Sequence, residues 1–208
     1  MLTIISLLVL LSVGLLVRAA IKGDTAGGYV FKPLSTIIIV TAAVLSFTSP
    51  DNNTAYGVII TCGLLLSFFG DITLMLPWDK ALPLGMAFFL LAHIIYGFGF
   101  MRIDPFSPAD VILAAAILLF GLIIFTLLYP NLGKMRIPVL TYVIAISFML
   151  WRALLTGSPL IMIGALLFYL ADGMESYSRF MNKSAWIRPV YLSLYYAGQL
   201  LIALSISL

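Results

Sequence analysis

Residues 57–76 read GVIITCGLLLSFFGDITLML, an apolar run broken by a single ionisable side chain, Asp71. A run of about 20 apolar residues is long enough to cross the hydrocarbon core of a bilayer as a helix. A carboxyl group within such a segment costs about 3 kcal/mol and is rare unless it has a function. The segment therefore predicts a membrane-spanning helix and marks Asp71 as a candidate functional residue.

Further segments of the same character predict the fold class. The 208 residues are 63% hydrophobic and only 9% charged, whereas a soluble domain carries about a quarter charged residues. Eight apolar segments run over residues 2–17, 32–48, 56–76, 82–101, 110–129, 137–155, 159–176 and 189–207. We expect Pro33, Pro138 and Pro189 in the first turns of their helices, where proline is tolerated. The sequence predicts an all-α polytopic membrane protein with about eight transmembrane helices, forming one integral-membrane domain over residues 1–208.

Lysine and arginine predict the orientation of these helices. The odd-numbered connections hold nine of the eleven basic residues, namely Arg18, Lys22, Lys32, Lys80, Lys134, Arg136, Arg179, Lys183 and Arg188. The even-numbered connections hold only Arg102 and Arg152. Because basic loops stay in the cytoplasm, we expect a protein of the plasma or inner membrane with both termini outside. Arg18 directly precedes Ala19 and Ala20, so the first segment is expected to be a span and not a cleaved signal peptide.

The two halves of the chain resemble each other. The spacing from Gly63 to Asp71 equals that from Gly164 to Asp172, and the stretch KPLST at 32–36 parallels IPVLT at 137–141. Four spans per half would give both halves the same orientation. These matches predict pseudo-repeats over 1–103 and 104–208 with the two acids facing each other, the alternative being chance similarity between Leu-rich helices.

Few polar side chains fall within the predicted spans, and the simplest way to keep them from lipid is to point them into one cavity. They are Asp71, His93, Asp172, Glu175 and Gln199, the hydroxyls of Tyr96, Tyr169, Tyr195 and Tyr196, and Lys32 at the mouth of its span. His93 shares a helix face with Tyr96, and Asp172 shares one with Glu175. Structural alternatives stay open: an Asp71–Lys32 pair, a solvated helix end at Asp172, a core His93, and a helix–helix contact by Gln199.

Two carboxyl groups in one low-dielectric cavity are suited to acid–base hydrolysis, one protonated and the other ionised. A lone histidine without a cysteine partner or H-x-x-x-H spacing is a poor zinc site, so we expect no metal and no cofactor. The rival hypothesis is a small transporter or lipid carrier, which should show helices broken at the acidic site. The basic residues form no cluster typical of nucleic-acid binding, so the expected partners are the bilayer and a lipid.

The chain resembles the YhhN family of membrane proteins, whose characterised members are lysoplasmalogenases. The resemblance rests on Phe31-Lys32-Pro33-Leu34, Gly70-Asp71, Phe88–His93 with Tyr96, the segment around Asp172, and Tyr195–Gln199. It covers nearly the whole chain in order and spacing.

The resemblance implies hydrolysis of the vinyl ether bond of a 1-alkenyl lysophospholipid, giving a fatty aldehyde and a glycerophospho-ethanolamine or -choline. Asp71 and Asp172 would form the catalytic pair, with His93 orienting one of them or relaying protons. Lys32 could hold the substrate's phosphate as a point charge. The remaining candidate substrate contacts are Tyr96, Tyr169, Glu175, Tyr195 and Gln199.

Overall fold

The computed structural model of the chain describes residues 2–47, 53–100, 106–182 and 184–207. These residues contain no strand and form eight long helices, each long and apolar enough to cross a membrane. The helices are α1 (Leu2–Lys22), α2 (Thr25–Ser46), α3 (Thr54–Thr73), α4 (Ala81–Gly99), α5 (Pro108–Leu128), α6 (Arg136–Leu154), α7 (Pro159–Phe180) and α8 (Ile187–Leu204). The predicted fold class is confirmed. Two residues of the predicted charge asymmetry, Arg102 and Lys183, lie outside the described residues.

Short polar side chains set the beginnings of several helices. The carboxylate of Asp24 accepts a hydrogen bond from the Gly27 amide (3.0 Å) and caps α2. Ser107 and Asp110 form a capping box at the start of α5, which satisfies amide groups that the helix itself leaves free. Gly23, at φ +67°, makes the tight turn between α1 and α2, a conformation that glycine adopts without steric cost.

The position of Pro33 corrects one expectation. Because Asp24 caps α2, the helix begins at Thr25 and Pro33 lies in its interior, not in its first turn. Pro138 and Pro189 do lie in the first turns of α6 and α8, as predicted. Lys32 is therefore displaced from the helix start into the body of α2.

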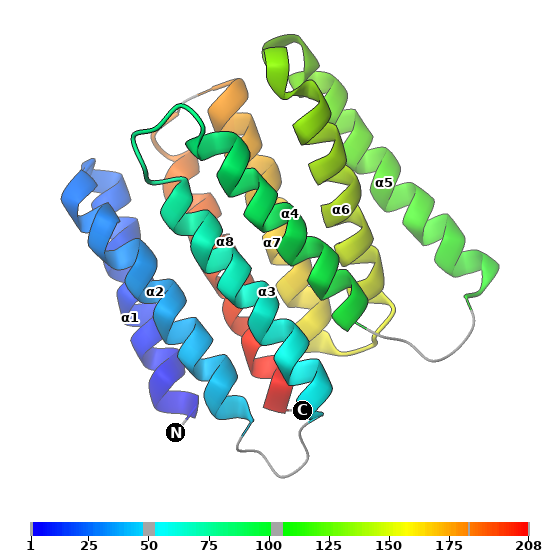
Figure 1. Cartoon of the computed structure of the whole chain (residues 1–208), viewed down its shortest axis with the longest axis horizontal. Helices are drawn as coiled ribbons and strands as arrows, with labels where there is room; N and C mark the ends of the chain where they lie inside the picture. The colour runs from blue at the N-terminus through cyan, green and yellow to red at the C-terminus, as the bar shows by residue number, and fades with distance from the viewer. Residues whose placement is uncertain (1, 48–52, 101–105, 183, 208) are drawn as a thin grey trace.

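The helices run up and down, so the two ends of the bundle differ in their connections (Figure 1). The turns after α1, α3, α5 and α7 gather at one end, and both termini lie at the other. The described basic residues of the odd-numbered connections therefore share one end of the molecule. We call this the basic end.

Close packing of α7 on α8 supports the centre of the bundle. A Cβ atom on Gly198 would lie 2.7 Å from the Gly164 carbonyl oxygen, so these two glycines let the helix backbones touch. Small residues at such crossings are typical of membrane helices. Helix α5 lies at the edge (Figure 1), and among its described residues only Gly121 and Leu128 are buried.

The helix contacts of the two halves correspond. Helix α2 packs on α3 of its own half and on α8 of the other half, while α6 packs on α7 and on α4. These contacts are those expected if 1–103 and 104–208 are pseudo-repeats, which stays a prediction. They bring the acid-bearing helices α3 and α7 to the same central cavity.

Candidate active site

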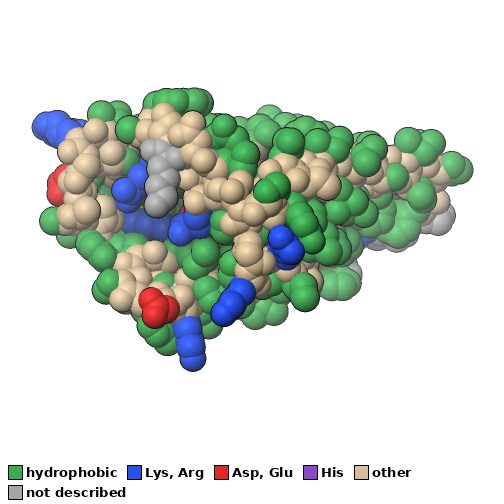
Figure 2. All heavy atoms as spheres, turned by 90° about the horizontal axis from the view of Figure 1, so that it is seen from above, with side chains coloured by type: hydrophobic (Ala, Val, Ile, Leu, Met, Phe, Trp, Pro, Cys, Tyr) green, Lys and Arg blue, Asp and Glu red, His purple; other side chains and the backbone are tan. Residues whose placement is uncertain are grey.

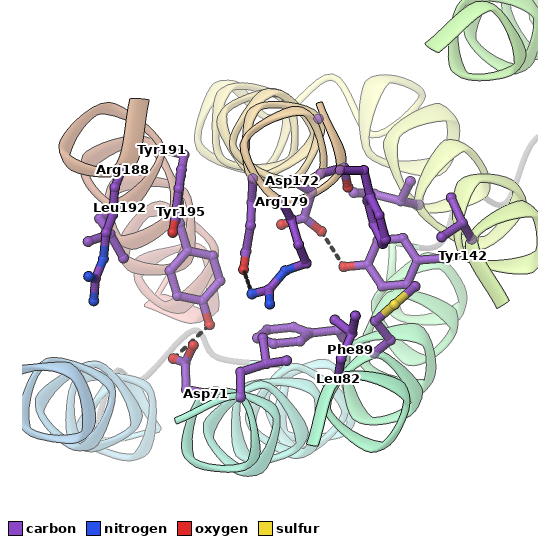
Figure 3. Close-up of a pocket in the computed structure, with 18 of the residues that line it drawn as sticks. Asp71, Leu82, Phe89, Tyr142, Asp172, Arg179, Arg188, Tyr191, Leu192 and Tyr195 are labelled. Atoms are coloured by element: carbon purple, nitrogen blue, oxygen red, sulfur yellow. Dashed lines mark hydrogen bonds and ion pairs between the residues drawn. The ribbon is translucent and has the colours of Figure 1, made fainter. Parts of the chain in front are cut away.

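A cavity of about 420 Å³ lies in the bundle, with lining residues from all eight helices. Seen from the basic end, the surface is hollowed and Lys and Arg side chains gather around the hollow (Figure 2). Asp71 and Asp172 project into this cavity from α3 and α7 (Figure 3). Neither helix is broken at its carboxylate, in contrast to the expectation for a transporter.

Asp71 is surrounded by hydrogen-bond donors. It is 2% exposed, and one carboxylate oxygen lies 3.1 Å from Nζ of Lys32. The other oxygen accepts hydrogen bonds from the hydroxyls of Thr36 (2.9 Å), Tyr195 (3.0 Å) and Tyr196 (3.3 Å). Four donors, one of them cationic, stabilise the ionised form of a carboxyl group.

Asp172 has far fewer partners. Its carboxyl group accepts a hydrogen bond from the hydroxyl of Tyr142, and Nε2 of His93 lies 3.7 Å away. No lysine or arginine among the described residues forms an ion pair with it. A carboxyl group in apolar surroundings without a cation is suited to the neutral, proton-bearing form.

His93 is completely buried, and neither of its ring nitrogens has a hydrogen-bond partner among the described residues. Its ring packs edge-on against Tyr142 and Phe168, at centroid distances of 5.1 and 4.9 Å. A buried polar group without a partner is costly and uncommon in native proteins. The free nitrogens beside Asp172 could therefore accept or pass on a proton.

Two predicted residues lie behind the cavity wall. The hydroxyl of Tyr96 donates to Oε1 of Gln199 (3.2 Å), and Nε2 of Gln199 donates to the hydroxyl of Tyr195 (3.0 Å). Tyr96 and Gln199 are fully buried and do not line the cavity. They hold Tyr195 in place, and Tyr195 in turn contacts Asp71.

Two others line the cavity at its ends. Glu175 lies toward the basic end and accepts a hydrogen bond from Arg179 (2.7 Å). Tyr169 lies toward α5, and its hydroxyl is 3.5 Å from the carbonyl oxygen of Ile117. The sequence predicts Lys32 at the mouth of its span. In the structure its ammonium instead forms an ion pair with the Asp71 carboxylate.

Sequence reasoning missed Tyr142, Thr36, Arg179 and Arg188, all close to the cavity or its acids. Thr36 follows Lys32 by one helical turn, and this spacing could have placed both on the face toward Asp71. Arg179 and Arg188 were used only to predict topology. No sequence signal separates Tyr142 from the tyrosines that line membrane surfaces.

The chain is similar in sequence to several proteins named lysoplasmalogenase. It is 34% identical to human lysoplasmalogenase TMEM86B over 170 residues, which are 81% of this chain and 71% of that protein. It is 34% identical to the mouse protein of the same name over 142 residues (68% of this chain, 60% of that protein). A Mycobacterium bovis protein named lysoplasmalogenase is 33% identical over 150 residues (67% of this chain, 56% of that protein). The chain thus spans less than two thirds of the mouse and mycobacterial proteins.

No solved structure matches the chain significantly. The family is identified from sequence, because the model of the YhhN family matches residues 27–206, which include both cavity acids, His93 and Tyr195. This eight-helix membrane protein therefore belongs to the YhhN family.

Proposed function

We propose that the protein is a lysoplasmalogenase, which hydrolyses the vinyl ether bond of 1-alkenyl lysophospholipids to a fatty aldehyde and a glycerophospho-ethanolamine or -choline. The observation that carries the proposal is the pair of unequal carboxyl groups in one buried cavity. The names of the human, mouse and mycobacterial relatives support the substrate class.

The first step would be protonation of carbon. Asp172, in its neutral form, would transfer its proton to the alkene carbon that is not bonded to oxygen. The remaining positive charge is then shared by the neighbouring carbon and the ether oxygen. General acid catalysis of this kind typically contributes a factor of about 100 to 10,000.

Asp71 would stabilise that cation. Its donors, Lys32 among them, would keep it ionised before substrate arrives, so its negative charge would already be present when positive charge develops on the substrate. An oxyanion hole would serve no purpose in this reaction because the intermediate is a cation.

Water would complete the reaction. It adds to the cationic carbon and returns one proton to the Asp172 carboxylate, which restores the acid. The resulting hemiacetal splits into the aldehyde and the free glycerol hydroxyl. His93, 3.7 Å from Asp172, would relay the proton or orient the carboxyl group.

The alkenyl chain would lie in the apolar part of the cavity. Ile124, Leu128, Val139 and Val143 from α5 and α6 line this part. Relative to water, an apolar chain is stabilised there by about 0.8 kcal/mol for each buried methylene, whereas relative to the equally apolar lipid tails the gain is small. A site between membrane helices suits a substrate that is itself dissolved in the bilayer.

The test is aldehyde release from 1-alkenyl lysophosphatidylethanolamine and lysophosphatidylcholine by the purified protein in detergent. The variants are Asp71→Asn and Asp172→Asn, with Asp79→Asn in the exposed α3–α4 connection as the matched control. In D2O the aldehyde should carry one deuterium on the carbon next to its carbonyl, which reports protonation of carbon. Absence of aldehyde with both head groups, from folded parent protein, would refute the proposal.

We further propose that the basic end faces the cytoplasm. The charge asymmetry of the connections supports this orientation. A reporter fused after Leu208 should then read as external, and a cytoplasmic signal would overturn the orientation.

A further inference from the structure

We propose that Arg188 binds the phosphodiester of the substrate at the mouth of the cavity, an inference that rests on the proposed function. Three cationic side chains line the cavity: Lys32, Arg179 and Arg188. Two of them are already paired with acids. The third is available for an anionic ligand.

The paired cations are Lys32 and Arg179. Nζ of Lys32 lies 3.1 Å from the Asp71 carboxylate and 3.4 Å from its backbone oxygen. Moving this ammonium to a phosphate would leave Asp71 buried without its counterion, which is strongly unfavourable. Nη2 of Arg179 lies 2.7 Å from Glu175 on the same helix, so its charge is largely balanced.

Arg188 has no hydrogen-bond or ion-pair partner among the described residues, although it lines the cavity. It lies in the first turn of α8, and its Nη2 reaches the α2 side, 3.8 Å from where a Cβ on Gly28 would be. The guanidinium therefore lies on the α2 side of α8 at the cavity, and Arg188 is exposed. A planar guanidinium binds a phosphodiester through two parallel hydrogen bonds.

One face of α8 leads from Arg188 toward Asp71. Arg188, Tyr191 and Tyr195 follow one another at helical spacing, and all three line the cavity. Figure 3 shows them along one side of it, with Tyr195 bonded to Asp71. Seven residues of helix separate Arg188 from Tyr195 by about 10 Å. The glycerol unit of a lysophospholipid, which links the ether oxygen to the phosphate, would lie along this face.

The same phosphate chemistry could come from free inorganic phosphate, so the experiment must separate the two sources. We would compare 1-alkenyl lysophosphatidylethanolamine with 1-alkenylglycerol, which has the vinyl ether but no phosphate. The variants are Arg188→Gln and Arg188→Lys. Arg136→Gln is the matched control, because Arg136 is a basic-end arginine that stacks on Tyr129 and does not line the cavity.

Arg188→Gln should raise KM for the phospholipid about tenfold, the size expected for losing a hydrogen bond to a charged group. It should leave kcat within about twofold, and it should leave both constants for 1-alkenylglycerol at the parent values. Arg188→Lys should give a KM between those of Arg188→Gln and the parent. Arg136→Gln should give the parent KM and kcat. An equal increase of KM for both substrates, or an unchanged KM for the phospholipid, would overturn the assignment.

A binding measurement separates this proposal from the proposed function. The probes are a non-hydrolysable 1-alkyl lysophosphatidylethanolamine, 1-alkylglycerol and inorganic phosphate, each tested for thermal stabilisation of the parent and of Arg188→Gln. Arg188-dependent stabilisation by the alkyl phospholipid supports the site even if the parent releases no aldehyde. Stabilisation by inorganic phosphate alone would overturn it, as would stabilisation by the phospholipid that does not depend on Arg188.

Discussion

Asp71 and Asp172 hold matching places in the two predicted repeats, yet their surroundings are opposite. Asp71 has a lysine and three hydroxyl donors. Asp172 has one tyrosine hydroxyl and a histidine 3.7 Å away. The difference teaches that a pair of similar carboxyl groups can be assigned different tasks by their neighbours alone, one as a fixed charge and one as a proton donor.

The helix arrangement explains how the neighbours come to differ. Each acid is approached by the second helix of its own half and the fourth helix of the other half. At Asp71 these helices supply Thr36 from α2 and Tyr195 from α8; at Asp172 they supply Tyr142 from α6 and His93 from α4. If the two halves are the predicted repeats, the proposed division of roles between the acids comes from these side chains.

The largest expected effect is the loss of turnover when either acid is replaced, and it tests the comparison between Asp71 and Asp172. Asp71→Asn and Asp172→Asn should each lower turnover about a thousandfold, but only Asp71→Asn should also destabilise the fold. It leaves the ammonium of Lys32 without its carboxylate partner, which we expect to cost about 3 kcal/mol. Asp172→Asn removes no ion pair with a lysine or arginine among the described residues. Thermal unfolding in detergent, measured beside aldehyde release, checks both statements.

The double variant Lys32→Met/Asp71→Asn provides the control. Removing both charges should return the melting temperature toward the parent value while turnover stays lost. If the double variant is no more stable than Asp71→Asn, the ion pair is not the source of the destabilisation.

The next effect concerns His93. His93→Leu should lower turnover about a hundredfold, at the low end for acid–base catalysis. Stability should be unchanged or higher, because the substitution removes ring nitrogens that have no hydrogen-bond partner among the described residues. Loss of turnover together with a large loss of stability would instead make His93 a packing residue.

The fold could be predicted from hydropathy because a bilayer leaves the backbone few alternatives to helices. The beginning of α2 could not be predicted in this way. In the sequence Asp24 and Gly23 resemble any polar connection, and only the structure shows that Asp24 caps the helix. The acids and His93 stood out because each is costly in lipid. Arg188 did not stand out, because an arginine in a connection between spans carries no free-energy cost of burial in lipid.

Tyr142 is the next residue that separates the two half-sites. Tyr142→Phe removes the hydrogen-bond donor to Asp172 and should lower turnover about tenfold. Tyr177→Phe is the matched control, since Tyr177 lies on the same helix as Asp172 but is exposed and does not line the cavity; its turnover should stay within about twofold of the parent. Equal losses of turnover in both variants would show a general effect of removing a tyrosine hydroxyl.

The smallest expected effect concerns Gln199, which acts on Asp71 only through Tyr195. Gln199 contacts no acid but donates to the hydroxyl of Tyr195 (3.0 Å), which itself donates to Asp71. Gln199→Leu should lower kcat about threefold, the effect of weakening one hydrogen bond in a network whose other donors to Asp71 remain. Gln199→Glu keeps the shape and still allows contacts with Tyr96 and Tyr195. It adds a carboxyl group behind Asp71, so a larger loss with Glu than with Leu would show that the Asp71 side responds to charge more than to packing.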